Sequence, residues 1–524
     1  MSEDSIGLHA ERAATTWPRF EFAELDGRRL TFEELGAWVR RAAAELVSRG
    51  IEPGDRVLVQ LPNCLEVIVL QLAAWRIGAV AVPVVPIYRE REVTQIVRDC
   101  RPDAVVTVER LRDRHLRAEL DRCLAAADVR PKVRYVVGDA VVGWTRVPES
   151  DSPGRPVGEL PAPAKPDECC LILYTSGTTS APKGAMLSSA ALVAATRAWE
   201  RLWIGKEDVA LGVAPLAHIA GMVPSCLVPL TVGCRVTILP RWDVNAAAEA
   251  IHRESATFST GANVFLRDLV DHYERRSSQG LHKLTYFVSG GAATPPALVE
   301  RAAALGMGAM RAYGMTETAG VISMADGDAP LERRARFDGR LLDDVEMRVV
   351  DALGNELPPG EEGSLVIRGP QLMLGYTDSA INARQFRDGW FDPGDIGSIG
   401  SDRWLRITGR TKDIINRGGE KFSARDIEEA ILLHESVSDT AVIPIPDDRF
   451  GEAVCAFVVL RDDAVIASTD EIATFMLASG IAKAKVPVEW HVIDRIPTTA
   501  TGKVKKFELA GQRGQTPTET GAAL

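Results

Sequence analysis

The sequence predicts an α/β protein, with a large N-terminal part of mixed sheets flanked by helices and a small α+β part at the C-terminal end. Strand and helix signals alternate through most of the chain, which is typical of a parallel or mixed sheet covered by helices. The 524 residues exceed one typical domain, so we expect at least two hydrophobic cores. A composition of 46% hydrophobic and 25% charged residues excludes wholesale disorder.

The elements of the N-terminal half follow from hydrophobic periodicity and local signals. Thr31 and Glu34 have the spacing of a capping box ahead of an apolar-periodic helix to about Arg49, and Gly50 then ends the helix. Further apolar runs predict a helix over residues 65–76 and strands over residues 55–61, 79–85, 104–108 and 133–137. Five prolines between residues 153 and 166 predict an extended surface connection.

A fresh βα pattern begins after a strand at 404–407 and the polar segment 409–413. It predicts, in order, a helix over 425–434, strands over 440–445 and 454–460, a helix over 469–478 and a strand over 488–492. A tail of this size can form its own small domain. We therefore expect one domain over residues 1–410 and a second over residues 411–524.

Charge and composition exclude several classes of function. A net charge of −11 argues against bulk attraction to nucleic acid or to an anionic membrane, so bound anions need a local site. Residues 211–234 carry no charge, but Pro215, Pro224 and Pro229 interrupt them, which favours buried segments over a membrane helix. Eight cysteines without a CxxC pair fit a reducing compartment, and we expect a cytoplasmic protein.

A loop rich in hydroxyl groups follows the apolar strand at 169–174. Between this strand and a helix expected near Ser188, the loop offers the groups that a polyphosphate needs, namely backbone N–H groups, short hydroxyls and one ammonium. The residues of this candidate phosphate site are Thr175, Ser176, Gly177, Thr178, Thr179 and Lys183. It is not a Walker A loop, because Pro182 precedes the lysine and Gly184 follows it. A Ser/Thr/Gly surface turn is the alternative interpretation.

With six further motifs in order, the sequence resembles the adenylate-forming superfamily of acyl- and aryl-CoA synthetases, adenylation domains and luciferases. The resemblance extends from about Leu30 to Lys506. The motifs cover residues 215–221, 289–292, 313–318, 389–395, 409–413 and 497–503. It implies a distorted barrel subdomain in the N-terminal part and a mobile C-terminal domain. It also implies ATP, Mg²⁺ and CoA as reactants and cofactors.

The resemblance implies roles for residues around the phosphates. Thr316 would contact the α-phosphate of ATP, and Glu317 would help to hold Mg²⁺, whereas the dipeptide alone is more typical of a polar turn or helix start. Lys503 would swing in from the C-terminal domain and bridge the reacting carboxylate and the phosphate. Taken alone, Lys503 would be read as part of a solvated tail.

The resemblance also implies the nucleoside site and the CoA channel. Gly290, Gly291 and Ala292 would let adenine lie against backbone, with a tight loop as the alternative. Tyr313, next to Gly314, would stack on adenine, although it could simply be a core residue. Asp395 would bind the ribose hydroxyls, although residues 392–395 are also typical of a turn. Arg410 would reach the ribose and phosphate, although a lone arginine before a linker is more often solvated. Lys412 matches the hinge. Gly419 falls beside the pantetheine arm of CoA, with a hairpin turn as the alternative.

His218 matches the residue at the mouth of the acid pocket. Relatives that activate amino acids carry an acidic partner for the α-ammonium, and none stands in this segment, which argues against an amino acid substrate. The pocket candidates by position are His218, Met222, Asn263, Gly290, Gly314, Met315 and Val321. They favour a bulky, largely apolar acid, aryl or alicyclic. Ser180, Ser189, Pro393 and the segment 260–263 depart from the usual family pattern.

These observations together predict an ATP-dependent acid:CoA ligase that forms an acyl adenylate and then a CoA thioester. The first alternative is an adenylating enzyme that passes the acyl group to a separate carrier protein or partner enzyme. A nucleotide-binding regulator without turnover is disfavoured because Lys503, Glu317 and Asp395 are all present. A Walker-type NTPase is disfavoured because no Ser or Thr follows the lysine of the phosphate loop. We expect no nucleic-acid or membrane partner and leave a homodimer open.

Overall fold

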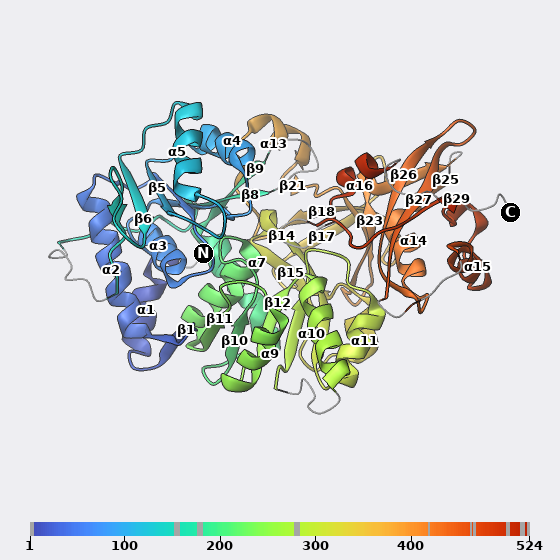
Figure 1. Cartoon of the computed structure of the whole chain (residues 1–524), viewed down its shortest axis with the longest axis horizontal. Coiled ribbons are helices and arrows are strands. Elements are labelled where there is room, and N and C mark those ends of the chain that lie inside the picture. Colours follow the sequence, from blue (N-terminus) through green and yellow to red (C-terminus); the bar gives the residue numbers. More distant parts are fainter. Residues whose placement is uncertain are drawn as a thin grey trace.

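The computed structural model describes residues 5–150, 158–175, 182–276, 283–417, 420–461, 464, 468–498, 504–513 and 519–520. Its strands form four sheets with helices packed on them, as expected for an α/β chain (Figure 1). Three sheets lie in the N-terminal part and one in the C-terminal part, on the right of the view.

The first sheet has eight strands, parallel in its centre and antiparallel at one edge. Its order is β19 (Gly375–Tyr376), β9 (Lys183–Ser188), β8 (Cys169–Thr175), β4 (Val80–Pro83), β3 (Arg56–Gln60), β5 (Ala104–Val108), β6 (Val133–Val137) and β7 (Thr145–Arg146). Helices α2 (Phe32–Ser48), α3 (Leu65–Arg76), α4 (Glu90–Cys100) and α5 (Leu116–Ala127) belong to this part of the chain. The helices and strands expected here are confirmed, with the Thr31–Glu34 capping box at the start of α2.

The second sheet has nine strands and a parallel centre. Its order is β16 (Arg340–Leu341), β15 (Gly320–Met324), β14 (Gly308–Met315), β13 (Tyr286–Ser289), β12 (Phe258–Gly261), β10 (Val209–Gly212), β11 (Arg235–Ile238), β1 (Glu21–Leu25) and β2 (Arg28–Thr31). The helices of this part are α1 (His9–Thr16), α6 (Ser189–Thr196), α9 (Val244–Arg253), α10 (Asn263–Arg276), α11 (Pro296–Ala304) and α12 (Leu331–Arg336).

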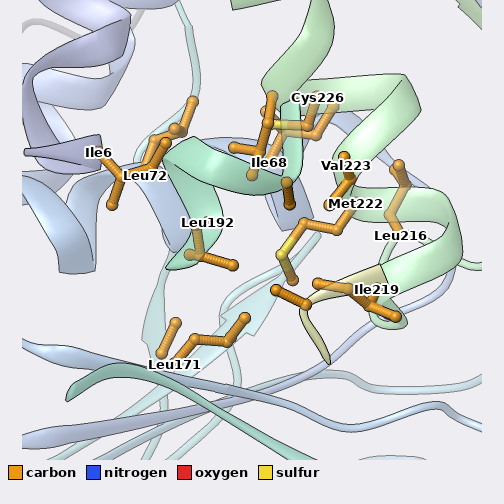
Figure 2. Close-up of a cluster of buried hydrophobic side chains, with 14 of the residues drawn as sticks. Ile6, Ile68, Leu72, Leu171, Leu192, Leu216, Ile219, Met222, Val223 and Cys226 are labelled. Atoms are coloured by element: carbon orange, nitrogen blue, oxygen red, sulfur yellow. The ribbon is translucent and has the colours of Figure 1, made fainter. Parts of the chain in front are cut away.

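A hydrophobic core joins these two sheets. Figure 2 shows side chains of α3, β8, α6 and the segment after β10 gathered in one cluster, among them Ile68, Leu171, Leu192 and Met222. Burying such side chains is the main source of folding free energy, at roughly 25 cal/mol per Å² of apolar surface. The well-packed core between the sheets therefore holds the loops at its edge in place.

The uncharged residues 211–234 are part of this core. They form the end of β10, α7 (Ile219–Met222), a π-helical turn (Val223–Leu227) and α8 (Val228–Val232), and most of their side chains are buried. Within the described part of the chain, no helix is long and apolar enough to cross a membrane. The expectation of buried segments is confirmed.

The third sheet is antiparallel and lies at the end of the N-terminal part of the chain. Its strands are β17 (Glu346–Val350), β18 (Gly363–Arg368), β20 (Phe386–Arg387), β21 (Trp390–Phe391), β22 (Asp395–Ile399) and β23 (Leu405–Arg410), with α13 (Ser379–Gln385) before β20. After β23, a single turn of 3₁₀ helix, η5 (Thr411–Asp413), leads into the fourth sheet.

The fourth sheet forms the small C-terminal part. Its strands are β24 (Ile414–Arg417), β25 (Glu420–Ser423), β26 (Val437–Asp447), β27 (Gly451–Leu460), β28 (Glu489–Val492) and β29 (Glu519–Thr520). Helices α14 (Ala424–Ile431) and α15 (Asp470–Ala478) contribute to one core and α16 (Lys506–Gln512) to another. The helices and strands expected after residue 424 are present, whereas the β24–β25 pair was not predicted.

Candidate active site

One large cavity lies where the four sheets approach one another. Its volume is about 1960 Å³, and its lining includes β8, β14, β23 and α14. It brings together ten of the residues expected to act on the substrates, which are Thr175, Lys183, His218, Gly291, Ala292, Tyr313, Gly314, Thr316, Glu317 and Asp395. Arg410 and Lys412 line it as well. Residues that are hundreds of positions apart in the chain therefore form one site.

Tyr313, Asp395 and Arg410 form a hydrogen-bonded group in this cavity. Tyr313 Oη donates to Asp395 Oδ2 at 2.7 Å, and Arg410 Nε donates to Asp395 Oδ1 at 2.6 Å. The pairing of β22 with β23 sets Asp395 directly opposite Arg410. Asp395 is only 3% exposed, and burial together with its charge raises the pKa of Tyr313 well above 10. The orientation of Asp395 is thus fixed by two hydrogen-bond donors.

Glu317 and Lys183 lie around a tyrosine that the sequence analysis did not identify. Glu317 belongs to the 3₁₀ turn η4 (Thr316–Thr318), and its Oε1 accepts a 2.7 Å hydrogen bond from Tyr376 Oη. Lys183 Nζ lies 5.6 Å from the centre of the Tyr376 ring. Burial, with the charge of Glu317, raises the pKa of Tyr376. Because Tyr376 stands in a two-residue strand, no periodic pattern could have indicated it.

The expected strand–loop–helix arrangement of the phosphate loop is wrong in one respect. A second strand, β9, follows the loop, pairs antiparallel with β8 and sets Thr175 opposite Lys183. Helix α6 begins at Ser189, as expected, and the Ser189 hydroxyl accepts a hydrogen bond from the backbone of Ile6. Lys183 therefore stands on a sheet strand. Ser176, Gly177, Thr178, Thr179 and the departure at Ser180 lie outside the described residues.

The glycines beside the cavity are needed there for different structural reasons. Gly291 has φ of +79° with open space where a Cβ would be, so the backbone conformation requires glycine there. At Gly314 a Cβ would lie 2.0 Å from the carbonyl oxygen of Gly320, so the close pairing of β14 with β15 excludes any side chain. Gly290 N donates to Gly261 O at 3.1 Å, and Ala292 lines the cavity.

His218 lies at the N-terminal end of α7, where its Nδ1 accepts a 3.3 Å hydrogen bond from Ala220 N. Ala217, Asn263, Gly314 and Met315 also line the cavity. Met222 is fully buried in the core shown in Figure 2. The contribution of Met222, Gly290 and Val321 to an acid pocket stays a prediction.

Lys412 lies in η5, at the junction between the third and fourth sheets, which is where a hinge was expected. Lys503 and Gly419 lie outside the described residues. The residues next to the 499–503 gap, Thr498 and Val504, line the cavity and pair with each other.

Two ion pairs that the sequence analysis missed connect the C-terminal part to the rest. Arg267 of α10 lies 3.1 Å from Asp439 of β26, and Arg425 of α14 lies 3.4 Å from the buried Asp338. Burial alone would raise the pKa of Asp338, but Arg311, at 2.8 Å, and Arg425 outweigh it, so the pKa is lowered. Partners so distant in sequence leave no local signal.

Models of known families match two long stretches of the chain. The description "AMP-binding enzyme" matches residues 10–377, and "AMP-binding enzyme C-terminal domain" matches residues 426–503. The chain belongs to the AMP-binding enzyme family. The resemblance seen in the sequence motifs is thereby confirmed.

Similar proteins cover almost the whole of this AMP-binding enzyme. The medium-chain fatty-acid–CoA ligase of Escherichia coli (strain K12) is 32% identical over 96% of this chain and 90% of its own. The 2-hydroxy-7-methoxy-5-methyl-1-naphthoate–CoA ligase of Streptomyces carzinostaticus is 32% identical over 98% of this chain and 93% of its own length. The crystal structure of ATP-bound MatB from Rhodopseudomonas palustris is 28% identical in sequence. It superposes with a TM-score of 0.85 over 98% of this chain and 100% of the MatB chain.

The oxygen donors of the cavity fit a magnesium ion. Mg²⁺ binds hard oxygen ligands, usually one or two carboxylates together with substrate phosphates and water. Glu317 supplies a carboxylate at the cavity wall, and the neighbouring Thr316 supplies a hydroxyl. This donor set is suited to Mg²⁺ brought in with ATP.

Proposed function

We propose that this AMP-binding enzyme is an acid:CoA ligase that activates a bulky, largely apolar carboxylic acid, aryl or alicyclic, through an acyl adenylate. The observation that carries the proposal is the meeting of Tyr313, Asp395 and Arg410 with Glu317 and Lys183 in one cavity. A nucleoside acceptor, a metal ligand and a phosphate-binding cation are what the first half-reaction requires.

In the first half-reaction, a carboxylate oxygen of the acid attacks the α-phosphorus of ATP, and pyrophosphate leaves. In the second, the thiol of CoA loses its proton and attacks the acyl carbon, and AMP leaves with the oxygen that came from the acid. Negative charge moves between oxygens in both steps, so fixed positive groups contribute most to the rate. Lys183, Arg410 and Lys503 would supply them, and bound Mg²⁺ would neutralise phosphate charge.

The nucleoside half of ATP would lie against the Asp395 group. Asp395 would accept the ribose hydroxyls, Tyr313 would stack on adenine, and Gly290 to Ala292 would leave room for the base. The family match over residues 10–377 supports the roles of Tyr313 and of Gly290 to Ala292, and the burial of Asp395 supports its own role. An ionised carboxylate accepts hydrogen bonds more strongly than a neutral group does.

The acid would enter beside His218. Its neighbours in the pocket would be Ala217, Gly314 and Met315, uncharged residues that line the same cavity. A wall without charges favours an acid without a second ionic group. The names of the Escherichia coli and Streptomyces relatives, a fatty-acid and a naphthoate ligase, are compatible with apolar acids.

The C-terminal residues 411–524 would rotate about Lys412 between the two half-reactions, in the cytoplasm where ATP and CoA are available. In the adenylation pose Lys503 would reach the reacting carboxylate. The position of Val504 at the cavity supports this role.

A pyrophosphate-release screen tests the proposal. A panel of aryl, alicyclic, polycyclic and fatty acids is offered with ATP and Mg²⁺, with and without CoA, and thioester formation is measured separately. We expect release with aryl or alicyclic acids and one thioester per pyrophosphate when CoA is present. Adenylate that accumulates while CoA is not consumed would refute the ligase assignment.

A further inference from the structure

A short segment, residues 373–377, joins the two sheets that flank the ATP site. On one side, Tyr376 pairs with Ala185 of β9, and Thr377 N donates to Gly184 O at 2.8 Å. On the other side, Met373 N donates to the backbone oxygen of Glu317 at 2.8 Å. The segment is thus bonded both to the strand that carries Lys183 and to the turn that carries Glu317.

The side chain of Tyr376 also contacts both of these elements. Its hydroxyl donates to Glu317 Oε1 at 2.7 Å, and its ring faces Lys183 Nζ at 5.6 Å. Tyr376 is 3% exposed, so water competes little for either contact. One buried side chain therefore touches both the expected metal ligand and the expected phosphate ligand.

Asn382 fixes the backbone of Tyr376. Its Oδ1 accepts from Tyr376 N at 2.7 Å, and its Nδ2 donates to Tyr376 O at 2.9 Å. Asn382 stands in α13, whose first turn is capped by Asp378. Gly375, with φ of +137°, allows the sharp approach of the chain to this amide. Two hydrogen bonds with the Asn382 side chain therefore fix the backbone of Tyr376.

We propose that Tyr376 is a positioning residue that orients the Glu317 carboxylate for Mg²⁺ and supports Lys183 at the phosphates. Its hydrogen bond occupies one acceptor site of Oε1 and limits rotation of the carboxylate, while the other acceptor sites stay available to the ion. The face of its ring attracts the Lys183 ammonium. This inference rests on the proposed function.

Calorimetric titration of ATP, with and without Mg²⁺, separates the two contacts in the full-length chain. Tyr376→Phe removes the hydroxyl and keeps the ring, so ATP affinity should fall about 10- to 100-fold with Mg²⁺ and should hardly change without it. Tyr376→Leu also removes the ring, so affinity without Mg²⁺ should fall as well. The matched control is Tyr273→Phe, which removes the hydrogen bond of another buried tyrosine, to His252 on α9.

A double-mutant cycle shows whether Tyr376 acts through Glu317. In a Glu317→Gln background, Tyr376→Phe should cause no further loss of Mg²⁺-dependent affinity, because the carboxylate that it orients is gone. Equal losses in both backgrounds would overturn the inference. A Tyr376→Phe chain that fails to fold would overturn it too, because the hydroxyl would then be a structural requirement.

The wild-type titration keeps the two proposals apart. Wild-type chain that binds ATP more tightly with Mg²⁺, together with an unchanged Tyr376→Phe variant, would refute only the role of Tyr376. Wild-type chain that shows no Mg²⁺-dependent ATP binding would refute the proposed function, and the inference with it.

Discussion

The phenol of Tyr313 donates a 2.7 Å hydrogen bond to Asp395, across the junction between the nine-stranded sheet and the third sheet. Arg410 holds the other carboxylate oxygen at 2.6 Å. Asp395 is therefore buried, and two hydrogen bonds fix its orientation. An acceptor fixed in this way loses little entropy when it binds a ligand.

The substitution Asp395→Asn should weaken nucleotide binding strongly. It removes the charge that faces Arg410 and leaves that guanidinium, in contact with the cavity, without its counter-charge. We expect kcat/KM for ATP to fall by about 100-fold, from a loss of about 3 kcal/mol. Tyr313→Phe keeps the ring and should cost about 10-fold or less. Calorimetric affinity for AMP checks both, and an Asp395→Asn variant that binds AMP normally would contradict the assigned role.

Lys503→Ala should separate the two half-reactions. A preorganised cation at the reacting phosphate is worth about 100- to 1000-fold in rate, so pyrophosphate release should fall by that factor. Thioester formation from supplied acyl adenylate should be far less affected, because the carboxylate is already activated. Lys132→Ala, which breaks an ion pair with Asp55 just before β3, is the control. Equal loss in both half-reactions would remove Lys503 from the adenylation step.

Lys412→Pro should slow the second half-reaction most. Proline fixes φ near −65° and restricts the rotation expected at η5 between the third and fourth sheets. We expect adenylate formation to be retained and CoA consumption to fall, as measured in single-turnover assays. Lys412→Ala, which leaves the backbone free, should behave like wild type in the CoA step. Unchanged overall turnover of the proline variant would show that this turn is not the hinge.

An ion cluster far from the cavity predicts a dependence of stability on pH. Burial alone would raise the pKa of Glu254, but hydrogen bonds from Arg235, Arg253 and Arg29 lower it from 4.5 to about 2. A lowered folded pKa gives stability that is complete above pH 4.5 and is lost as the pH falls towards 2.

Glu254→Gln should therefore lower the free energy of unfolding at pH 7 by about 2 kcal/mol, since half-exposed Arg29 and Arg253 are partly screened. The difference between the variant and wild type should shrink between pH 4.5 and 2. Urea denaturation at a series of pH values measures it. A constant difference over that range would contradict the lowered pKa.

The sequence motifs indicated single candidate residues of the site but not the contacts between them. Tyr313 and Asp395 were each identified, yet their hydrogen bond depends on how two sheets meet, which no motif encodes. Asp395 contacts Arg410 because the register of β22 and β23 sets the two residues opposite each other. The motifs do not specify that register.

The remaining differences have similar physical reasons. Strand β9 was missed because its six residues are followed directly by a helix, so the phosphate loop was expected to lead straight into that helix. Tyr376 was missed because a two-residue strand has no period. The Arg267–Asp439 pair joins residues 172 positions apart, and only the folded chain brings them together. Long helices such as α2 and α3 were predicted well because each has a strong apolar pattern.

The most direct test of the central claim follows one oxygen atom through the reaction. An accepted acid labelled with ¹⁸O in its carboxylate is converted with ATP, Mg²⁺ and CoA, and the AMP is analysed by mass spectrometry. An acyl-adenylate mechanism predicts one ¹⁸O atom in the phosphate of AMP for each thioester formed. Label in inorganic phosphate with ADP as the product, or thioester formation with unlabelled AMP, would contradict the account.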